Sequence, residues 1–482
     1  MVYRWRHRSE SQTTIRQFLP ADRFNIFIQH IHSANPAKPH NKANKQIQQS
    51  HTAKPAKPHS KANKANKQSR TAKPISKANK ANKAIQLSRT TKPTSKHIHL
   101  TYLMNNQLTL NGKQSAGRIA FIDYIRVIAC FLVMLVHASE NFYGADSSGL
   151  AGNMSMLANE ANRFWVAFYD GFVARTCVPL FMIVSAFLLV PMKNGVTMGE
   201  FYRKRFTRIL PPMLVFMVLY TFLPLLWGGM QWEQSLADLK RLPFNFPSMA
   251  GHLWFMYPLI SLYLIIPVVS PWLERASAKD ERIFLGIFIV STFIPWIHRF
   301  ITPELWGECF WNGFTMLWYC SGYLGYLVMA HYIRFHLDWD KAKRLRVGAL
   351  CFLVGAAFTG WSFYLKGVPG QLIETPELEW SWAFCTPNVL LASFGAFLLF
   401  TCITRKEAPA IVTGLSKLSF GMYLMHMFFL GPIAKVFVAG NAAQPLIPVW
   451  AAIPVIAVLS FICCAIASWL ISKIPGSKWV IG

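Results

Sequence analysis

From residue 118 onward, the chain alternates between apolar segments of about twenty residues and short polar or charged connections. A helix of that length spans the hydrocarbon core of a bilayer. The pattern predicts ten spans, at approximately residues 119–138, 172–190, 209–227, 253–271, 283–298, 312–331, 346–365, 383–403, 417–437 and 448–471. The sequence therefore predicts an all-α fold, a polytopic membrane helix bundle of about ten transmembrane helices within residues 104–482.

The charges of the connections alternate along the chain. Basic clusters occur in every second connection and after the last span, at residues 193–208, 275–282, 334–346, 405–417 and 473–478. The connections between them contain acidic residues, among them Glu140, Asp170 and Glu374. Cytoplasmic loops of membrane proteins carry an excess of Lys and Arg. We therefore expect both ends of the bundle to lie in the cytoplasm and the protein to be a multi-pass component of the inner cell membrane.

Residues 1–103 have a different character. They contain 21 Lys and Arg residues against two acidic ones, a large share of the net charge of +28. Near-copies of one motif recur at Ser50, Ser69 and Ser88, and the segment is rich in Asn, Ala and Pro. Such a composition cannot bury a core, so we expect a disordered, solvated tail rather than a nucleic-acid-binding domain. Met104 is favoured as the natural start of the protein.

The first predicted span contains three polar side chains that are costly in a membrane, Asp123, Arg126 and His137. Arg126 and His137 are eleven residues apart, which returns to within about 20° of the same helix face and about 16 Å further along the axis. Asp123 lies one turn before Arg126, where an ion pair would lower the cost of the guanidinium group. The alternative is that Asp123 and Arg126 anchor the helix near the headgroups and that His137 is an interfacial residue.

Two further polar groups mark the third and fourth spans. Arg205 and Arg208 lie one turn apart at the start of the third span, a spacing that suits phosphate as well as positive-inside anchoring. His252 lies at the outer entrance of the fourth span, where it could also belong to an interfacial belt with Trp254.

The ninth span contains Ser419, Tyr423 and His426 at spacings of four and three residues, which place them on one helix face. Such a polar stripe either lines a site or forms a hydrogen-bonded seam between helices. The nine cysteines lack paired metal-binding spacing, and neither a nucleotide-binding loop nor a zinc-protease motif is present. We expect no metal.

These motifs together resemble the acyltransferase-3 family of integral membrane acyltransferases, and the resemblance covers residues 118–482. Its strongest element is Asp-x-x-Arg followed by Arg-x10-His in the first span. The segments VPLFMIVSAFLL with Ser185, RKRFTRILPP, HLWFMYPLISLYLI and LSFGMYLMH resemble the family's later motifs in the expected order. Ala186 departs from the pattern, because the family usually has Gly after the serine.

The resemblance implies transfer of an acetyl or other short acyl group from cytoplasmic acetyl-CoA to a hydroxyl group of an extracytoplasmic acceptor, such as a surface polysaccharide or its lipid-linked precursor. Membrane lipid is the surrounding partner. On this view His137 is a general base, or alternatively carries the acyl group covalently. Asp123 orients Arg126, which steadies the thioester, and Arg205 and Arg208 bind the CoA phosphates.

The resemblance further places a set of side chains along the substrate path: Ser185, His252, Trp254, Ser419, Tyr423 and His426. A transporter or exporter of a lipid or sugar is the main alternative, since it too has many spans and charges within the membrane. The two halves of the chain show no repetition, and no later span repeats the pairing of Arg126 with His137. A non-catalytic scaffold would leave that pairing unexplained.

Overall fold

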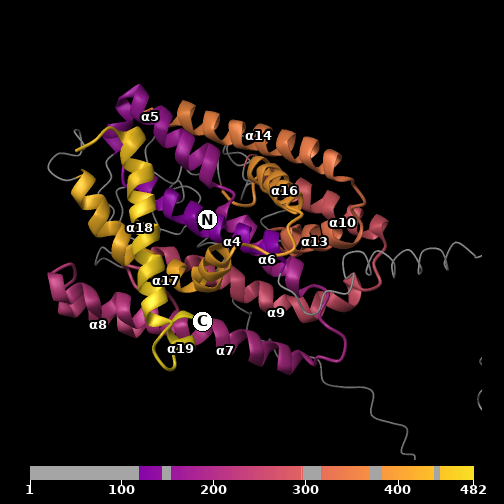
Figure 1. Ribbon diagram of the computed structural model, residues 1–482, viewed down its shortest axis with the longest axis horizontal. Coiled ribbons are helices and arrows are strands. Elements are labelled where there is room, and N and C mark those ends of the chain that lie inside the picture. The colour runs from indigo at the N-terminus through magenta and orange to yellow at the C-terminus, as the bar shows by residue number, and fades with distance from the viewer. Residues whose placement is uncertain (1–118, 144–153, 295, 297–315, 369–382, 439–445) are drawn as a thin grey trace, which may run out of the picture. The chain divides into compact units, whose positions relative to one another are not determined.

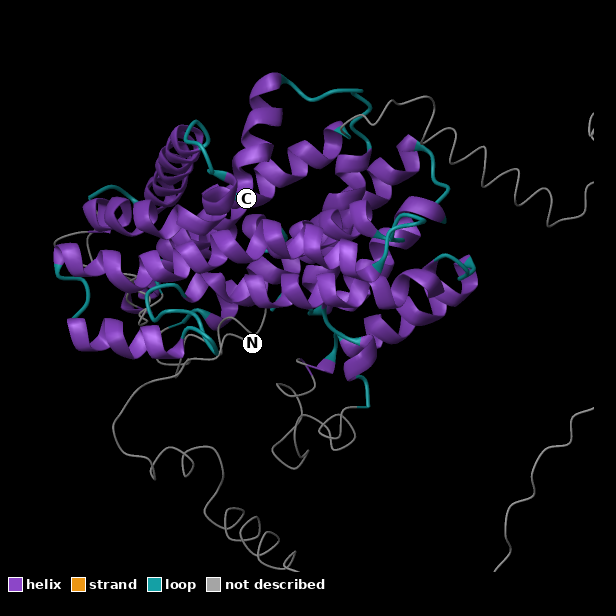
Figure 2. Cartoon of the chain, turned by 90° about the horizontal axis from the view of Figure 1, so that it is seen from below, coloured by secondary structure: helices purple, strands orange, loops and turns teal. Residues whose placement is uncertain are grey.

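The structure is a computed structural model that describes residues 119–143, 154–294, 296, 316–368, 383–438 and 446–482. These residues belong to one of two compact units in the chain. Every regular element in the described ranges is a helix, as Figure 2 shows. The predicted all-α class is therefore confirmed. The predicted disorder of residues 1–103 and the acidic connection around Glu374 lie outside the described residues.

The helices follow one another along the chain with few long connections (Figure 1). Their bounds are α4 (Ala120–Glu140), η1 (Met154–Ala158), α5 (Glu160–Val166), η2 (Ala167–Ala174), α6 (Cys177–Leu189), α7 (Met198–Phe222), η3 (Leu223–Trp227), α8 (Trp232–Arg241), η4 (Gly251–Phe255), α9 (Met256–Leu273), α10 (Ala278–Ser291), η5 (Trp318–Cys320), α13 (Tyr323–Phe335), α14 (Lys341–Lys366), α16 (Pro387–Thr401), α17 (Ala410–Val438), α18 (Val449–Ile471) and α19 (Lys478–Ile481).

Within the described residues, seven helical segments are long and apolar enough to cross a membrane. They are Ala120–Glu140, Glu160–Leu189, Met198–Trp227, Gly251–Leu273, Lys341–Lys366, Ala410–Val438 and Val449–Ile471. Each coincides with one of the ten predicted spans. The other three predictions fall on α10, α13 and α16, which have 14, 13 and 15 residues in the described ranges. The apolar helices indicate a multi-pass membrane protein; the number ten and the side on which each end lies stay predictions.

The outward faces of the long helices carry large apolar side chains. Leu353 and Trp361 of α14 and Ile462 and Ile466 of α18 are all exposed. Exposed apolar faces of this extent are unfavourable in water, whereas a bilayer solvates them. The surface of these helices therefore agrees with the membrane assignment.

Helix α4 lies at the centre of the fold (Figure 1) and contacts α6, α16, α17, α18 and η2. It runs in the same direction as α17, because contacts between them advance together along both helices. Ser416 donates a hydrogen bond to Asp123 (2.6 Å), and the Cys130 thiol lies 3.6 Å from the Ser419 carbonyl oxygen. Further along, the rings of His137 and His426 stack. The site residues of the first and ninth predicted spans are therefore neighbours.

Small residues bring other helices into close contact. A Cβ atom on Gly395 of α16 would lie 2.3 Å from the Phe352 nitrogen of α14, and one on Gly171 of η2 would lie 2.9 Å from the Gly360 Cα atom. Glycine at such positions lets helix backbones approach within a membrane. The α14–α16 pair and the η2 segment are thus held against each other by backbone packing.

Candidate active site

His137 lies in the last turn of α4, beside an acidic side chain of the same helix. Its Nδ1 atom is 2.6 Å from a carboxylate oxygen of Glu140, and both side chains are 16% exposed. An ionised carboxylate only accepts hydrogen bonds, so Nδ1 is the nitrogen that donates. The other ring nitrogen, Nε2, then has a lone pair that can take a proton. This is the arrangement by which a carboxylate fixes the tautomer of a basic histidine.

Two more histidines lie near His137, and each comes from a different part of the chain. The His426 ring of α17 stacks on His137 with 5.1 Å between centroids, and the His252 ring of η4 meets His426 edge-on at 4.7 Å. Both added rings are buried, His426 completely. The fold thus brings together the histidines of three predicted spans.

Each of the two buried imidazoles has one nitrogen without a hydrogen-bond partner among the described residues. His426 Nδ1 lies 2.5 Å from the carbonyl oxygen of Tyr423, whereas its Nε2 is buried and has no partner. His252 Nε2 is near the Leu424 carbonyl oxygen (3.3 Å), and its Nδ1 has no partner. Since carbonyl oxygens accept only, the free nitrogen of each neutral ring is an acceptor. Buried unsatisfied acceptors are unfavourable and are suited to a ligand that carries hydroxyl groups.

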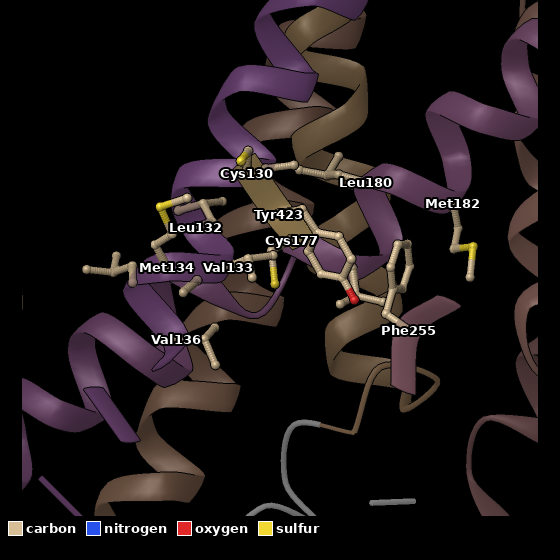
Figure 3. Packing of buried hydrophobic residues seen from close by; sticks show 14 of the residues in the cluster. Cys130, Leu132, Val133, Met134, Val136, Cys177, Leu180, Met182, Phe255 and Tyr423 are labelled. Atoms are coloured by element: carbon tan, nitrogen blue, oxygen red, sulfur yellow. The ribbon is translucent and has the colours of Figure 1, made fainter. Parts of the chain in front are cut away.

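Two tyrosines fix the backbone around this group of histidines. Tyr423 donates to the His252 carbonyl oxygen (2.6 Å), and Tyr220 donates to the Leu424 carbonyl oxygen (3.1 Å). The Tyr423 ring meets Phe255 at 5.6 Å, within the apolar packing that Figure 3 shows. Tyr423, predicted to line the substrate path, therefore has its hydroxyl group bonded to the backbone that carries His252.

A second charged group lies at the same end of α4, in the segment of helix that includes η2. Asp170 belongs to this π-helical turn and is fully buried. It accepts hydrogen bonds from the Tyr143 hydroxyl (2.5 Å) and from Arg175 (2.7 Å), and Arg175 also lies 3.3 Å from that hydroxyl. Wide helical turns of this kind often occur at functional sites. The η2 segment packs against α4 and so supports the end that carries His137.

The acidic residues of this region were assigned to outer connections by the charge pattern, and that assignment is wrong for two of them. Glu140 is the last residue of α4, and Asp170 lies within a continuous helical segment. The alternation of charges along the sequence predicted only the side of the membrane on which these acids lie, and not their contacts. The spacing of three residues between His137 and Glu140 is the signal that could have predicted their contact.

The other predicted residues of α4 lie toward its beginning. Asp123 is buried and bound by Ser416, whereas Arg126 is half-buried. The predicted pairing of Asp123 with Arg126 stays a prediction. Ser419, predicted on the same path, donates to the Ser416 carbonyl oxygen at 3.0 Å, within its own helix. The hydrogen bond between Asp123 and Ser416 joins α4 to α17, and a role of Ser419 on the substrate path stays a prediction.

Between Arg126 and His137, the shared face of α4 is apolar. Ala129, Cys130 and Val133 are buried there, and Figure 3 shows Cys130 and Val133 within the hydrophobic packing. The predicted stripe therefore has its polar side chains at the two ends.

The basic run of α7 is near the beginning of that helix. Arg205 is half-buried, with its guanidinium carbon 5.6 Å from the centre of the Phe201 ring, and Arg208 is exposed. A cleft of about 640 Å³ on the same part of α7 is lined by Gly195, Val196, Glu200, Arg203, Lys204, Thr207 and Trp479, and not by Arg205 or Arg208. Arg203 and Lys204 are thus basic residues of the cleft that the one-turn spacing of Arg205 and Arg208 did not indicate. Thr207 is 13 residues before Tyr220, or about 20 Å along α7, so the cleft is far from the histidines.

Ser185 and Trp254 complete the predicted set. Ser185 lies in α6 and is half-buried. The Trp254 ring, in η4, stacks on Phe384 with 5.6 Å between centroids. Trp254 is thus two residues from His252 in sequence but packs against the segment that precedes α16. Its role on a substrate path stays a prediction.

Comparison with known protein families shows to which family the chain belongs. Residues 119–469 match the family profile of acyltransferase 3, described as an acyltransferase domain. The chain belongs to the acyltransferase-3 family. The predicted resemblance is confirmed, and this member of the acyltransferase-3 family combines an acyltransferase domain with several membrane-crossing helices. Comparisons with curated proteins and with solved structures gave no match.

Proposed function

We propose that this membrane acyltransferase transfers an acetyl or other short acyl group from acyl-CoA to a hydroxyl group, and so acts as an O-acyltransferase. The acceptor is an extracytoplasmic glycan or glycolipid, and the enzyme lies in the inner membrane with residues 104–482 as its catalytic domain. The observation that carries the proposal is the contact of His137 with Glu140, next to the buried acceptor nitrogens of His252 and His426.

In the proposed reaction, His137 acts as general base through Nε2. Glu140 holds the Nδ1 proton, and Nε2 removes the proton from the acceptor hydroxyl as its oxygen attacks the thioester carbonyl carbon. The carbon–sulfur bond breaks, and CoA leaves as a thiolate that takes the proton back from the imidazolium. The free nitrogens of His252 and His426 accept hydrogen bonds from neighbouring hydroxyl groups of the acceptor. Such bonds orient the acceptor before reaction.

A covalent route through an acylated His137 uses the same residues. In that route Nε2 attacks the thioester carbonyl carbon first, and CoA leaves as a thiolate. The acceptor hydroxyl oxygen then attacks the acyl group on the ring, its proton passes to the freed Nε2 and from there to the CoA thiolate, and the ring is neutral again. Incubation with labelled acetyl-CoA in the absence of acceptor distinguishes the covalent route from direct transfer. Release of one equivalent of CoA per chain, with label retained on the protein, indicates the covalent route; no release before acceptor is added indicates direct transfer.

The donor is proposed to bind at the other end of the bundle. CoA is polyanionic, and the beginning of α7 presents Arg205 and Arg208 on the same part of the helix as Arg203 and Lys204, which line the cleft. Guanidinium groups bind phosphates through paired hydrogen bonds. Arg126 is proposed to contact the pantetheine arm or the thioester oxygen between the two ends. Displacement of the apolar side chains along α4 is then part of donor binding.

Replacing Arg205 and Arg208 together with glutamine is expected to raise the KM for acyl-CoA and to leave kcat nearly unchanged. A hydrogen bond to a charged group contributes about 1.5–3 kcal/mol, so each arginine lost corresponds to a rise of about tenfold or more. Initial rates at varied acyl-CoA concentration measure this effect. Arg275→Gln, an exposed arginine after α9, is the matched control. A fall in kcat at unchanged KM would contradict the assignment.

The decisive experiment is acyl transfer by the purified protein in detergent or liposomes. Radiolabelled acetyl-CoA is incubated with candidate acceptors, first lipid-linked glycan precursors and then isolated surface polysaccharide. Label transfer that requires both the protein and the acceptor supports the proposed function. Movement of an intact lipid or sugar across liposomes without acetyl-CoA consumption would instead support a transporter.

A further inference from the structure

A second group of polar side chains lies apart from the His137 site, where α10 begins and α13 ends. Glu281 is in the first turn of α10, His331 is in the last turns of α13, and His336 follows that helix. His331 Nδ1 is 2.8 Å and His336 Nε2 is 2.9 Å from the same oxygen of Glu281, Oε1. The side chains of Glu281 and His331 are almost fully buried, whereas His336 is 13% exposed.

The Glu281 carboxylate is incompletely compensated by the described residues around it. Its second oxygen, Oε2, is buried without a hydrogen-bond partner among them. Its first oxygen, Oε1, accepts hydrogen bonds from both His331 and His336. The group is therefore a buried carboxylate whose neighbours are two imidazoles. A buried anion is strongly unfavourable unless a positive charge accompanies it.

In contrast to the expectation from the sequence motifs that no metal is bound, we propose that Glu281, His331 and His336 bind a divalent transition-metal ion, Zn²⁺. One ligand atom from each residue lies within 4.8 Å of the other two. Two imidazole nitrogens and a carboxylate oxygen are ligands typical of zinc, whereas Mg²⁺ and Ca²⁺ prefer oxygen ligands alone. Three protein ligands leave one position of a tetrahedral ion for water, on the side where His336 is partly exposed.

To admit the ion, the two contacts of Glu281 lengthen, and the two histidine nitrogens, which lie within 4.8 Å of each other, come to a tetrahedral separation. Zinc–ligand bonds of about 2.0–2.1 Å place ligand atoms about 3.3 Å apart in a tetrahedron, so the separations of 2.8 and 2.9 Å widen by about half an ångström. Each imidazole stays neutral and moves its proton to its other ring nitrogen, so that the lone pair faces the metal. The second carboxylate oxygen, Oε2, can then approach the ion as well.

The metal would join two helices that are already packed together further along. A Cβ atom on Gly325 of α13 would lie 2.1 Å from the Phe288 ring of α10, and Phe288 meets Tyr326 edge-on at 5.7 Å. Phe288 is two turns beyond Glu281, about 10 Å along α10. The ion therefore fixes the beginning of α10 to the end of α13, where the Phe288 contact does not reach. This inference rests on geometry alone and is independent of the proposed acyl transfer.

The test is metal binding by the purified full-length protein, carrying an affinity tag without histidine. After dialysis against a chelator, the protein is titrated with Zn²⁺, Co²⁺ and Mg²⁺. We expect one zinc per chain by elemental analysis, a visible absorption band with Co²⁺, and a rise in the unfolding temperature with Zn²⁺ but not with Mg²⁺. Substoichiometric zinc and an unchanged unfolding temperature at micromolar Zn²⁺ would overturn the proposal and leave protonated histidine as the partner of Glu281.

Variants of the ligands separate a built site from adventitious binding. His336→Ala and Glu281→Gln are each expected to weaken zinc binding at least about 100-fold, since even outer-shell changes cost 10–100-fold. Glu274→Gln, an exposed acid just after α9, is the matched control and should bind zinc as the unmodified protein does. His336 is partly exposed, so its variant keeps the test informative if Glu281→Gln does not fold. Equal zinc affinity in all three variants would place the metal elsewhere.

Discussion

His137→Ala is expected to reduce acyl transfer at least about 100-fold, because a positioned general base contributes about 10²–10⁴-fold to rate. The same loss is expected for the covalent route, since either one needs Nε2 of this ring. Rates of label transfer at saturating acetyl-CoA measure the effect. Glu140→Gln is expected to lower kcat by about tenfold, which is less than the effect of His137→Ala. The glutamine oxygen can still accept the hydrogen bond from Nδ1–H, but it carries no charge.

Two controls make this result specific for the imidazole. Ile128→Ala changes the exposed face of the same helix and should leave the rate unchanged. The unfolding temperature and the elution profile of His137→Ala in detergent should match those of the unmodified protein. A folded His137→Ala protein that retains more than about a tenth of the activity would remove the basis of the proposed mechanism.

Asp170→Ala is expected to produce the largest loss of stability. Its carboxylate is fully buried against Arg175, whose side chain is 7% exposed, and the substitution removes the carboxylate that pairs with this buried guanidinium group. Breaking a buried ion pair destabilises proteins by about 3–5 kcal/mol. Thermal unfolding in detergent should therefore shift to a clearly lower temperature.

Glu160→Ala is a matched control for Asp170→Ala, because the same helical segment contains a second pair of an acid and an arginine, in which the acid is exposed. Glu160 is 81% exposed and lies 3.7 Å from Arg163, so its removal should cost about 1 kcal/mol or less. Asp170→Ala combined with Arg175→Met should recover part of the loss, since neither charge then remains buried. Equal unfolding temperatures for Asp170→Ala and Glu160→Ala would show that the buried pair does not stabilise this segment.

The pattern of apolar and polar residues was sufficient to predict the long apolar helices and to single out three histidines within them. Length and hydropathy gave the seven longest spans, because a bilayer requires both within one segment. His137, His252 and His426 were each found as polar residues in otherwise apolar runs, where they are conspicuous. Their mutual contact was not predictable from spacing, since the three helices that carry them meet only through tertiary packing.

The charged groups were harder to predict from the sequence. Glu140 and Asp170 have the same character as acids in outer loops, and charge alternation alone cannot separate a loop from a buried helical position. The contact of Glu281 with His331 and His336 joins residues at least fifty positions apart, so no local motif reveals it. The apolar packing between Arg126 and His137 was likewise missed, because an eleven-residue spacing says nothing of the residues between.

The parallel course of α4 and α17 has a consequence for biosynthesis. His137 enters the membrane with α4, whereas His426 follows nearly three hundred residues later, with α17. The nascent chain therefore contains α4 throughout most of its translation, and it gains the stacked imidazole pair of His137 and His426 only when α17 has been inserted.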